Sequence, residues 1–162
     1  MLLVTLSELP NVPAVYAMYG GRARGLHVAY VGMADVLKRR VMQHLISRDS
    51  SVATGTSAAG LNPDHVTEVC WWEHPNFTER HVLEAAELVA FDVLQPVLRS
   101  RGAISERAKQ LYAGEAFREK MRPLFLGEPT GKVVIPTVQD VLRRIADLEH
   151  RLATIEKHLG RK

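Results

Sequence analysis

Two apolar segments near the start of the chain have the pattern of a β-hairpin. From Pro13 to Gly20 the side chains alternate with the period of two that is typical of a half-buried strand, and a second apolar run extends from His27 to Val31. A loop rich in glycine and arginine separates the two runs, and Gly32 ends the second. Strands joined by such a loop are expected to pair in an antiparallel hairpin.

The period becomes helical after this hairpin, from Asp35 onward. Apolar residues fall on one side of the predicted helix and polar residues on the other. The apolar positions are Val36, Leu37, Val41 and Leu45, and the polar positions are Lys38, Arg39, Arg40, Gln43 and His44. The Asp35 carboxylate is expected to cap this helix by accepting hydrogen bonds from the free N–H groups of the first turn.

The middle of the chain predicts a third strand and a second long helix. The β-branched and aromatic segment 66–72 is typical of a strand. A helix is expected to begin with a capping box at residues 76–79 and to end near Leu94, because Pro96 cannot continue it. Residues 47–64 are expected to form a long polar loop, which is either a tolerated insertion or a loop that becomes ordered on nucleic acid.

The last part of the chain predicts two helices on either side of an extended linker. Residues 105–121 have a helical pattern, and residues 126–136 are rich in proline and glycine. Thr137 is expected to cap a final helix, in which apolar residues recur alternately at three and four positions over three heptads. These a/d positions are Val138, Val141, Ile145, Leu148, Leu152, Ile155 and Leu159.

The charges beside this apolar seam predict a parallel homodimer. Arg144 and Arg151 occupy g positions, and Glu149 and Glu156 occupy e positions. In a parallel pair each g position faces the next e position of the partner, so that opposite charges meet, whereas an antiparallel pair would bring like charges together. Leu142 at an e position widens the apolar stripe, so packing onto the rest of the chain or a higher oligomer is the alternative.

Composition sets the class of protein without identifying its chemistry. The chain has 162 residues, 46% hydrophobic residues and a net charge of +3, with a pI of about 9.2, which gives mild support for a polyanionic partner. The single cysteine, Cys70, fits a reducing compartment. The apolar segment 1–5 is expected to form a short strand. Residues 1–10 lack the basic region and the long apolar run that are expected of a signal peptide. No segment is long enough to cross a bilayer, and a cytoplasmic, non-membrane protein is expected.

Four polar side chains converge on the predicted hairpin. Tyr16 and Tyr30 lie on neighbouring strands, while Arg40 and His44 share one helix face through their i,i+4 spacing. A guanidinium supplies charge for phosphate oxygens, and phenol or imidazole groups can move protons. Taken singly, each residue has an ordinary explanation as a packing tyrosine or a solvated helix residue.

These residues also carry a resemblance to the GIY-YIG nuclease family. Ala14-Val15-Tyr16 and Tyr30-Val31-Gly32 resemble its two short motifs, and Arg40 follows eight residues after Gly32. Glu87, nine residues before Pro96, resembles the glutamate that the family carries on a later helix. The chain departs from the pattern at Met33, where many members carry lysine, and after Pro96, where many carry asparagine.

The resemblance covers about the first hundred residues and implies an α+β fold, as expected for one small domain. The expected organisation is a three-stranded antiparallel sheet flanked by helices in residues 1–100, a helical extension at 101–126, a linker at 127–136 and a coiled-coil dimerisation helix at 137–160.

The activity that the resemblance implies is hydrolysis of phosphodiester bonds by a DNA endonuclease that depends on Mg²⁺ or Mn²⁺. Glu87 would bind the metal, Arg40 would neutralise charge on the phosphate, Tyr16 with His44 would activate water, and Tyr30 would position the phosphate or share the proton transfer. Additional DNA contacts are expected from Lys38, Arg39, Arg22 and Arg24. The alternative is a DNA-binding module that has lost catalysis and is dimerised by its C-terminal coiled coil.

Overall fold

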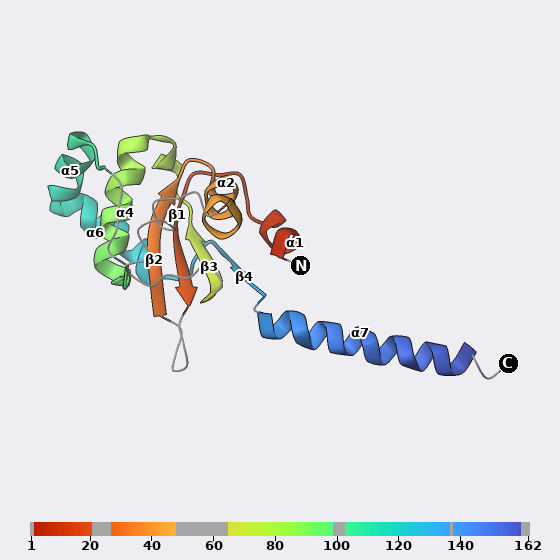
Figure 1. Cartoon of the computed structure of the whole chain (residues 1–162). Helices are drawn as coiled ribbons and strands as arrows, with labels where there is room; N and C mark the ends of the chain where they lie inside the picture. Colours follow the sequence, from red (N-terminus) through yellow and green to blue (C-terminus); the bar gives the residue numbers. More distant parts are fainter. Residues whose placement is uncertain (1, 21–26, 48–64, 99–102, 137, 160–162) are drawn as a thin grey trace.

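The computed structural model describes residues 2–20, 27–47, 65–98, 103–136 and 138–159, and these form an α+β structure around one antiparallel sheet (Figure 1). The strand order is β2-β1-β3-β4. The strands are β1 (Ala14–Gly20), β2 (His27–Ala34), β3 (Val66–Trp72) and β4 (Gly131–Val134). The helices are α1 (Leu2–Ser7), α2 (Leu37–Met42), η1 (Gln43–Ser47), η3 (Pro75–Thr78), α4 (Arg80–Leu94), α5 (Glu106–Ala113), α6 (Glu115–Leu126) and α7 (Val138–Leu159).

The sheet has four strands in the described residues, not the three that were expected. The additional strand, β4, comes from residues 127–136, which were expected to be linker, and it pairs with β3 in the register Trp71↔Gly131. Its β-branched side chains favour a strand, and Val133 is buried against the sheet. The sequence did not predict this short strand, because proline and glycine residues on either side of Val133 and Val134 are typical of a linker.

Alternate residues of the central strand β1 face two separate apolar layers. Tyr16 and Met18 pack on the side of α1 and α2, whereas Val15 and Ala17 pack on the side of α4 and α6. Figure 1 shows the sheet between these two layers. The alternation expected from the sequence therefore buries both faces of β1, since a period-two pattern directs successive side chains to opposite faces.

Several local expectations were wrong. Residues 2–7 form helix α1 rather than a strand. The expected capping box at 76–79 is a 3-10 turn, η3, and α4 starts after Glu79, which makes no side-chain cap. The single helix expected at 105–121 is two helices, because the chain leaves helical geometry at Gly114.

The last helix, α7, extends away from the sheet and its covering helices (Figure 1). Five of its apolar side chains are 46–57% exposed, namely Leu142, Ile145, Leu148, Leu152 and Ile155. Thr137 and the side chains of Val138 and Leu159 lie outside the described part of the chain. Within the described residues, no helix has the length and apolar character needed to cross a membrane.

Candidate active site

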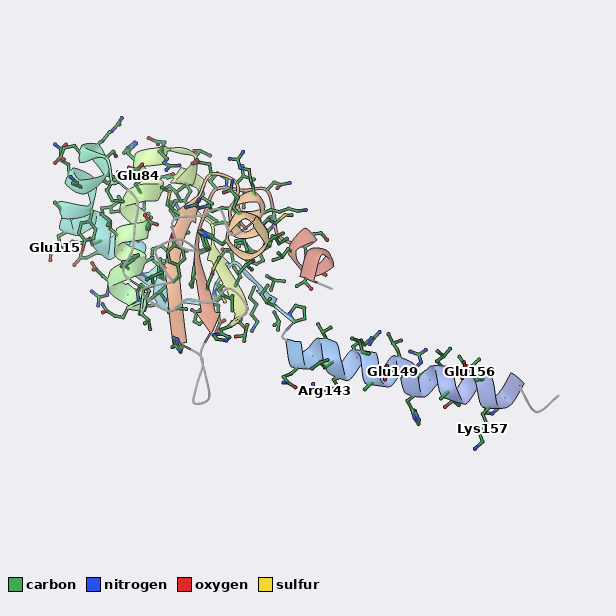
Figure 2. All side chains as sticks on the ribbon, in the orientation of Figure 1. Glu84, Glu115, Arg143, Glu149, Glu156 and Lys157 are labelled. Carbon is green, nitrogen blue, oxygen red and sulfur yellow. The ribbon has the colours of Figure 1, made fainter. Side chains whose placement is uncertain are left out.

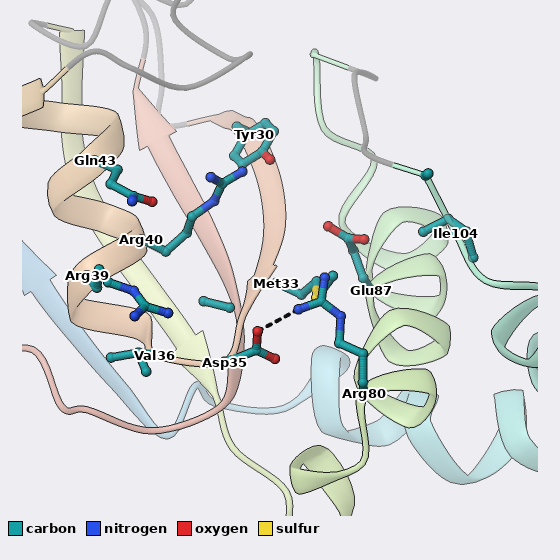
Figure 3. A pocket seen from close by; sticks show the side chains of 12 residues that line it. Tyr30, Met33, Asp35, Val36, Arg39, Arg40, Gln43, Arg80, Glu87 and Ile104 are labelled. Carbon is teal, nitrogen blue, oxygen red and sulfur yellow. Dashed lines mark hydrogen bonds and ion pairs between the residues drawn. The ribbon is translucent and has the colours of Figure 1, made fainter.

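A pocket of about 410 Å³ opens where β2, α2 and α4 meet. Its walls contain Tyr30 from β2, Arg40 from α2 and Glu87 from α4, which are three of the predicted site residues. The other lining residues are Met33, Ala34, Asp35, Val36, Arg39, Gln43, Arg80, Ala103 and Ile104. Figure 3 shows Arg40 extending toward Tyr30, with the Glu87 carboxylate on the opposite wall.

Behind Tyr30 lies a cluster of three rings that includes the other two predicted site residues. The phenol oxygen of Tyr16 is 2.6 Å from Nε2 of His44. The ring centroid of Tyr30 is 6.1 Å from that of Tyr16 and 5.4 Å from that of His44. Tyr16 is fully buried and His44 is 2% exposed, so Tyr30 is the member of the cluster that faces the pocket.

Local backbone geometry brings these rings together. Tyr16 and Gly32 are direct partners in the antiparallel ladder, and a Cβ atom on Gly32 would lie 2.7 Å from the Tyr16 hydroxyl and 2.7 Å from Cε1 of Tyr30. The glycine therefore leaves the space in which the two phenols meet. His44 lies in η1, where the helix after Met42 changes to π geometry, a feature often found at functional sites.

The buried cluster is electrically neutral around neutral pH. Burial, followed by the positive charge of Arg40, lowers the pKa of His44 from 6.5 to about 3. Burial, followed by the neighbouring Tyr30, raises the pKa of Tyr16 well above its usual value of 10. A neutral phenol beside a neutral imidazole can donate its proton to Nε2, so Tyr16 and His44 form a short proton path in the interior.

Arg40 and Glu87 act in opposite directions on the tyrosine that faces the pocket. The pKa of Tyr30 is raised by burial and then by the negative charge of Glu87, while the charge of Arg40 lowers it. Both charged groups therefore lie close enough to Tyr30 to influence its ionisation. A pocket with a guanidinium on one wall and a carboxylate on the other suits a phosphate group together with a cation.

The donor set fits a Mg²⁺ ion that shares its ligands with substrate. Magnesium is usually bound by one or two carboxylates, with waters and phosphate oxygens completing its coordination. Glu87 is 5% exposed and supplies one carboxylate in the pocket. No group of three or more His, Cys, Asp or Glu side chains suited to a metal occurs among the residues that the structure describes.

The predicted DNA contacts have different positions. Arg39 lines the pocket, whereas the Nζ of Lys38 donates to the Ser7 carbonyl oxygen at 3.0 Å and so ties α2 to α1. Arg22 and Arg24 lie outside the described residues.

Contrary to the expectation from the sequence, Asp35 does not cap α2. Val36 is the N-cap residue and makes no side-chain cap. The Asp35 carboxylate instead accepts a hydrogen bond from Nη1 of Arg80 at 2.6 Å.

Arg80 is the pocket residue that sequence reasoning missed. Its Nε donates to Glu84 at 3.0 Å, and the Glu84 carboxylate also accepts from the hydroxyl and backbone N–H of Ser105. The spacing along the chain could have indicated its position, because Arg80, Glu84 and Glu87 have the i, i+4, i+7 spacing of residues on one helix face.

Comparison with known proteins does not assign this site. Neither a scan against models of protein families nor searches of curated proteins and of solved structures found a match.

Proposed function

We propose that this protein is a DNA endonuclease of the GIY-YIG type that depends on Mg²⁺ or Mn²⁺. The observation that carries the proposal is the pocket in which Tyr30, Arg40 and Glu87 meet, backed by the Tyr16–His44 hydrogen bond. All five residues suggested by the resemblance contribute to one continuous arrangement, although they come from five separate elements, β1, β2, α2, η1 and α4. A set of ordinary packing residues gives no reason for a phenol, a guanidinium and a carboxylate to line one opening with a hydrogen-bonded phenol and imidazole behind them.

The aromatic cluster would remove a proton from the attacking water. Water forms a bond to phosphorus while the phosphorus–oxygen bond to the leaving group breaks, and the proton lost by water enters the cluster through the phenol at the pocket. Because both phenols are neutral, each must give up its own proton as it accepts one: Tyr30 would pass its proton to Tyr16, and Tyr16 would pass its proton to Nε2 of His44 over the 2.6 Å hydrogen bond. A bound phosphate would offset the charge of Arg40, which is one of the two causes that lower the pKa of His44, and would therefore make the imidazole a better acceptor.

Arg40 would bind the scissile phosphate and stabilise the charge that develops on it. Its guanidinium lies beside Tyr30 in the pocket, so the group that receives the proton and the group that holds the phosphate are neighbours (Figure 3). A preorganised charge of this kind is usually a large contribution to catalysis.

Glu87 would hold the divalent cation. When bound, the cation polarises the phosphate and stabilises the leaving oxygen. The carboxylate is fixed on α4, and the walls on either side of it come from elements that are packed into the core.

Nicking of supercoiled plasmid tests the proposal. The parent is expected to cut with Mg²⁺ and not in EDTA. Arg40→Ala and Arg40→Lys should both cut poorly, because lysine lacks the planar fork of arginine, whereas Arg39→Ala should have a mild effect. Glu87→Gln should abolish cutting and preserve DNA binding. Normal nicking by Arg40→Ala, or full cutting by the parent in EDTA, would contradict the proposal.

A DNA-binding module without catalysis is the second candidate. It is favoured by Met33, an uncharged residue that lines the pocket where many members of the resembled family carry lysine. The same plasmid assay separates the two, since such a module would retain DNA binding and leave the plasmid intact with Mg²⁺.

We also propose that α7 joins two copies of the chain. The seam side chains of Ile145, Leu148, Leu152 and Ile155 are 46–57% exposed, and a second α7 would cover them. Figure 2 shows charged side chains, including Glu149 and Glu156, projecting from this helix. Paired in parallel, two copies would present two nuclease pockets to one DNA duplex.

A further inference from the structure

Arg80 connects the two walls of the pocket. Its Nη1 lies 2.6 Å from Asp35, in the turn that precedes α2, and its Nε lies 3.0 Å from Glu84 on α4. Glu84 is itself held by Ser105, the N-cap residue of α5. The guanidinium is therefore fixed from both sides, at a point between the helix that carries Arg40 and the helix that carries Glu87 (Figure 3).

This fixed guanidinium still has the capacity to bind another group. Guanidinium carries five N–H donors, and the two carboxylates engage Nη1 and Nε, so donors are left for a further oxygen. The Arg80 side chain is 55% exposed and lines the pocket. Because its partners already order it, binding would cost little additional side-chain entropy.

The charge of the pocket favours an anion. Three arginines (Arg39, Arg40 and Arg80) and two carboxylates (Asp35 and Glu87) line it, which gives a net charge of 3 − 2 = +1. Arg39 and Arg40 belong to α2, and Arg80 is the arginine that the α4 wall supplies. A single phosphate at Arg40 would leave this cation on the opposite wall facing the path of the nucleic-acid backbone.

We propose that Arg80 is a second phosphate-binding residue of the pocket, which holds a backbone phosphate next to the one bound by Arg40. This inference rests on the proposed function. Asp35 engages Nη1 of the guanidinium, the phosphate is bound by the donors that remain, and the negative charge of the Asp35 carboxylate opposes that binding. The competing explanation is that Arg80 only braces α4 against the turn before α2.

Opposite effects of two substitutions distinguish phosphate binding from bracing. Arg80→Gln removes the cation, whereas Asp35→Asn removes the opposing charge and keeps the cation. Phosphate binding predicts that Arg80→Gln binds a labelled DNA duplex about fivefold more weakly, with a salt slope smaller by about one. It also predicts that Asp35→Asn binds as tightly as the parent or more tightly. Bracing predicts that the two substitutions weaken binding together, because both break the same bridge.

The measurement is fluorescence anisotropy in EDTA over a series of salt concentrations, so that cleavage does not interfere. Arg143→Gln is the matched control, because Arg143 also pairs with a carboxylate on its own helix, at 3.3 Å, and lies on α7 away from the pocket. Parental affinity and salt slope for Arg80→Gln, an equal loss for Asp35→Asn, or an equal loss for Arg143→Gln would each overturn the inference.

Circular dichroism checks that Arg80→Gln folds. If it does not fold, Asp35→Asn alone decides the inference: weaker binding overturns the inference, and equal or tighter binding supports it.

Two further results separate this inference from the proposed function. If the parent nicks plasmid and Arg80→Gln binds DNA as tightly as the parent, the role of Arg80 is contradicted and the proposed function is not. If the parent neither binds the duplex nor nicks plasmid, both the inference and the proposed function are contradicted.

Discussion

Gly32 lies across the ladder from Tyr16, and two phenols occupy the space that a side chain at this position would need. The neighbouring His44 is buried beside them and neutral, because burial and Arg40 both disfavour its charged form. The cluster therefore has a steric requirement at Gly32 and an electrostatic requirement at His44, and each can be tested by a single substitution.

Gly32→Ala is expected to disturb both tyrosines. Its Cβ would lie 2.7 Å from the Tyr16 hydroxyl and 2.9 Å from Cζ of the same ring, so the phenols must shift, at a cost of about 1–3 kcal/mol in the free energy of unfolding. Denaturant unfolding measures this change. Gly114→Ala is the control, because the one atom near its added Cβ, a carbonyl oxygen at 3.2 Å, has to move by only a few tenths of an ångström. Equal stability of the Gly32→Ala variant and the parent would contradict the packing described.

His44 is expected to make stability depend on pH. Its pKa is about 3 in the folded protein and near 6.5 when unfolded, so between these values the unfolded chain binds a proton that the folded chain does not. The free energy of unfolding should therefore be unaffected by this group above about pH 7 and fall by about 1–2 kcal/mol on going to about pH 5.

Denaturant unfolding over this pH range provides the measurement, with His44→Gln as the variant that lacks the titrating group. The decrease should be smaller in His44→Gln than in the parent, whereas His150→Gln, which changes an exposed histidine of α7, should behave as the parent. Identical pH dependence in the parent and His44→Gln would show that His44 is not buried in its neutral form.

At the scale of elements, β4 extends the sheet from a segment that its composition marked as linker. The Trp71 ring covers Gly131 so closely that a Cβ there would lie 2.2 Å from Cζ2 of the indole. An aromatic residue that packs over a glycine on the neighbouring strand helps to hold such an edge strand in register. This pairing links the residues that precede α7 to the same sheet that carries Tyr16 and Tyr30.

The two neighbouring valines of β4 provide a test of this strand. Val133 is 6% exposed and Val134 is 63% exposed. Val133→Ala should lower the free energy of unfolding by about 2 kcal/mol, whereas Val134→Ala should change it by less than about 0.5 kcal/mol. A linker would show equally small effects at both positions, and chemical denaturation of the two variants distinguishes these outcomes.

At the scale of the whole molecule, the sheet with its helices and the extended helix α7 have different kinds of surface. The sheet is covered on both faces, while α7 carries an uncovered row of large apolar side chains. Burial of such a row is favourable by roughly 25 cal/mol for each Å² removed from water. A second α7 offers the matching surface and also opposite charges at its e and g positions.

Leu148→Asp is expected to convert a dimer of the full chain into a monomer. Leu148 is 49% exposed and occupies a d position, so in the dimer a carboxylate would be buried in the seam. Ala146→Asp, two residues earlier and on the outer side of the helix, should leave the dimer intact. Sedimentation equilibrium measures both variants. A monomeric parent at micromolar concentrations, or a dimer that persists in Leu148→Asp, would remove α7 as the interface.

Local patterns were sufficient for the parts of the fold in which neighbouring residues decide the outcome. The period of two predicted β1 and β2, the period near 3.6 predicted α2 and most of α4, and the heptads predicted α7. Chemistry and spacing along the chain drew attention to Tyr16, Tyr30, Arg40 and His44, whereas Glu87 was named by the resemblance to the nuclease family.

Only tertiary structure decided how these segments meet. It added β4 to the sheet and placed Arg80 in the pocket, and in both cases the deciding contacts come from distant segments: Trp71 for β4, and Asp35 for Arg80. The neutral state of His44 likewise depends on burial by several elements. The sequence by itself determined which groups are present and which local structures they favour. Packing determined their distances and ionisation, because both depend on neighbours brought close only by folding.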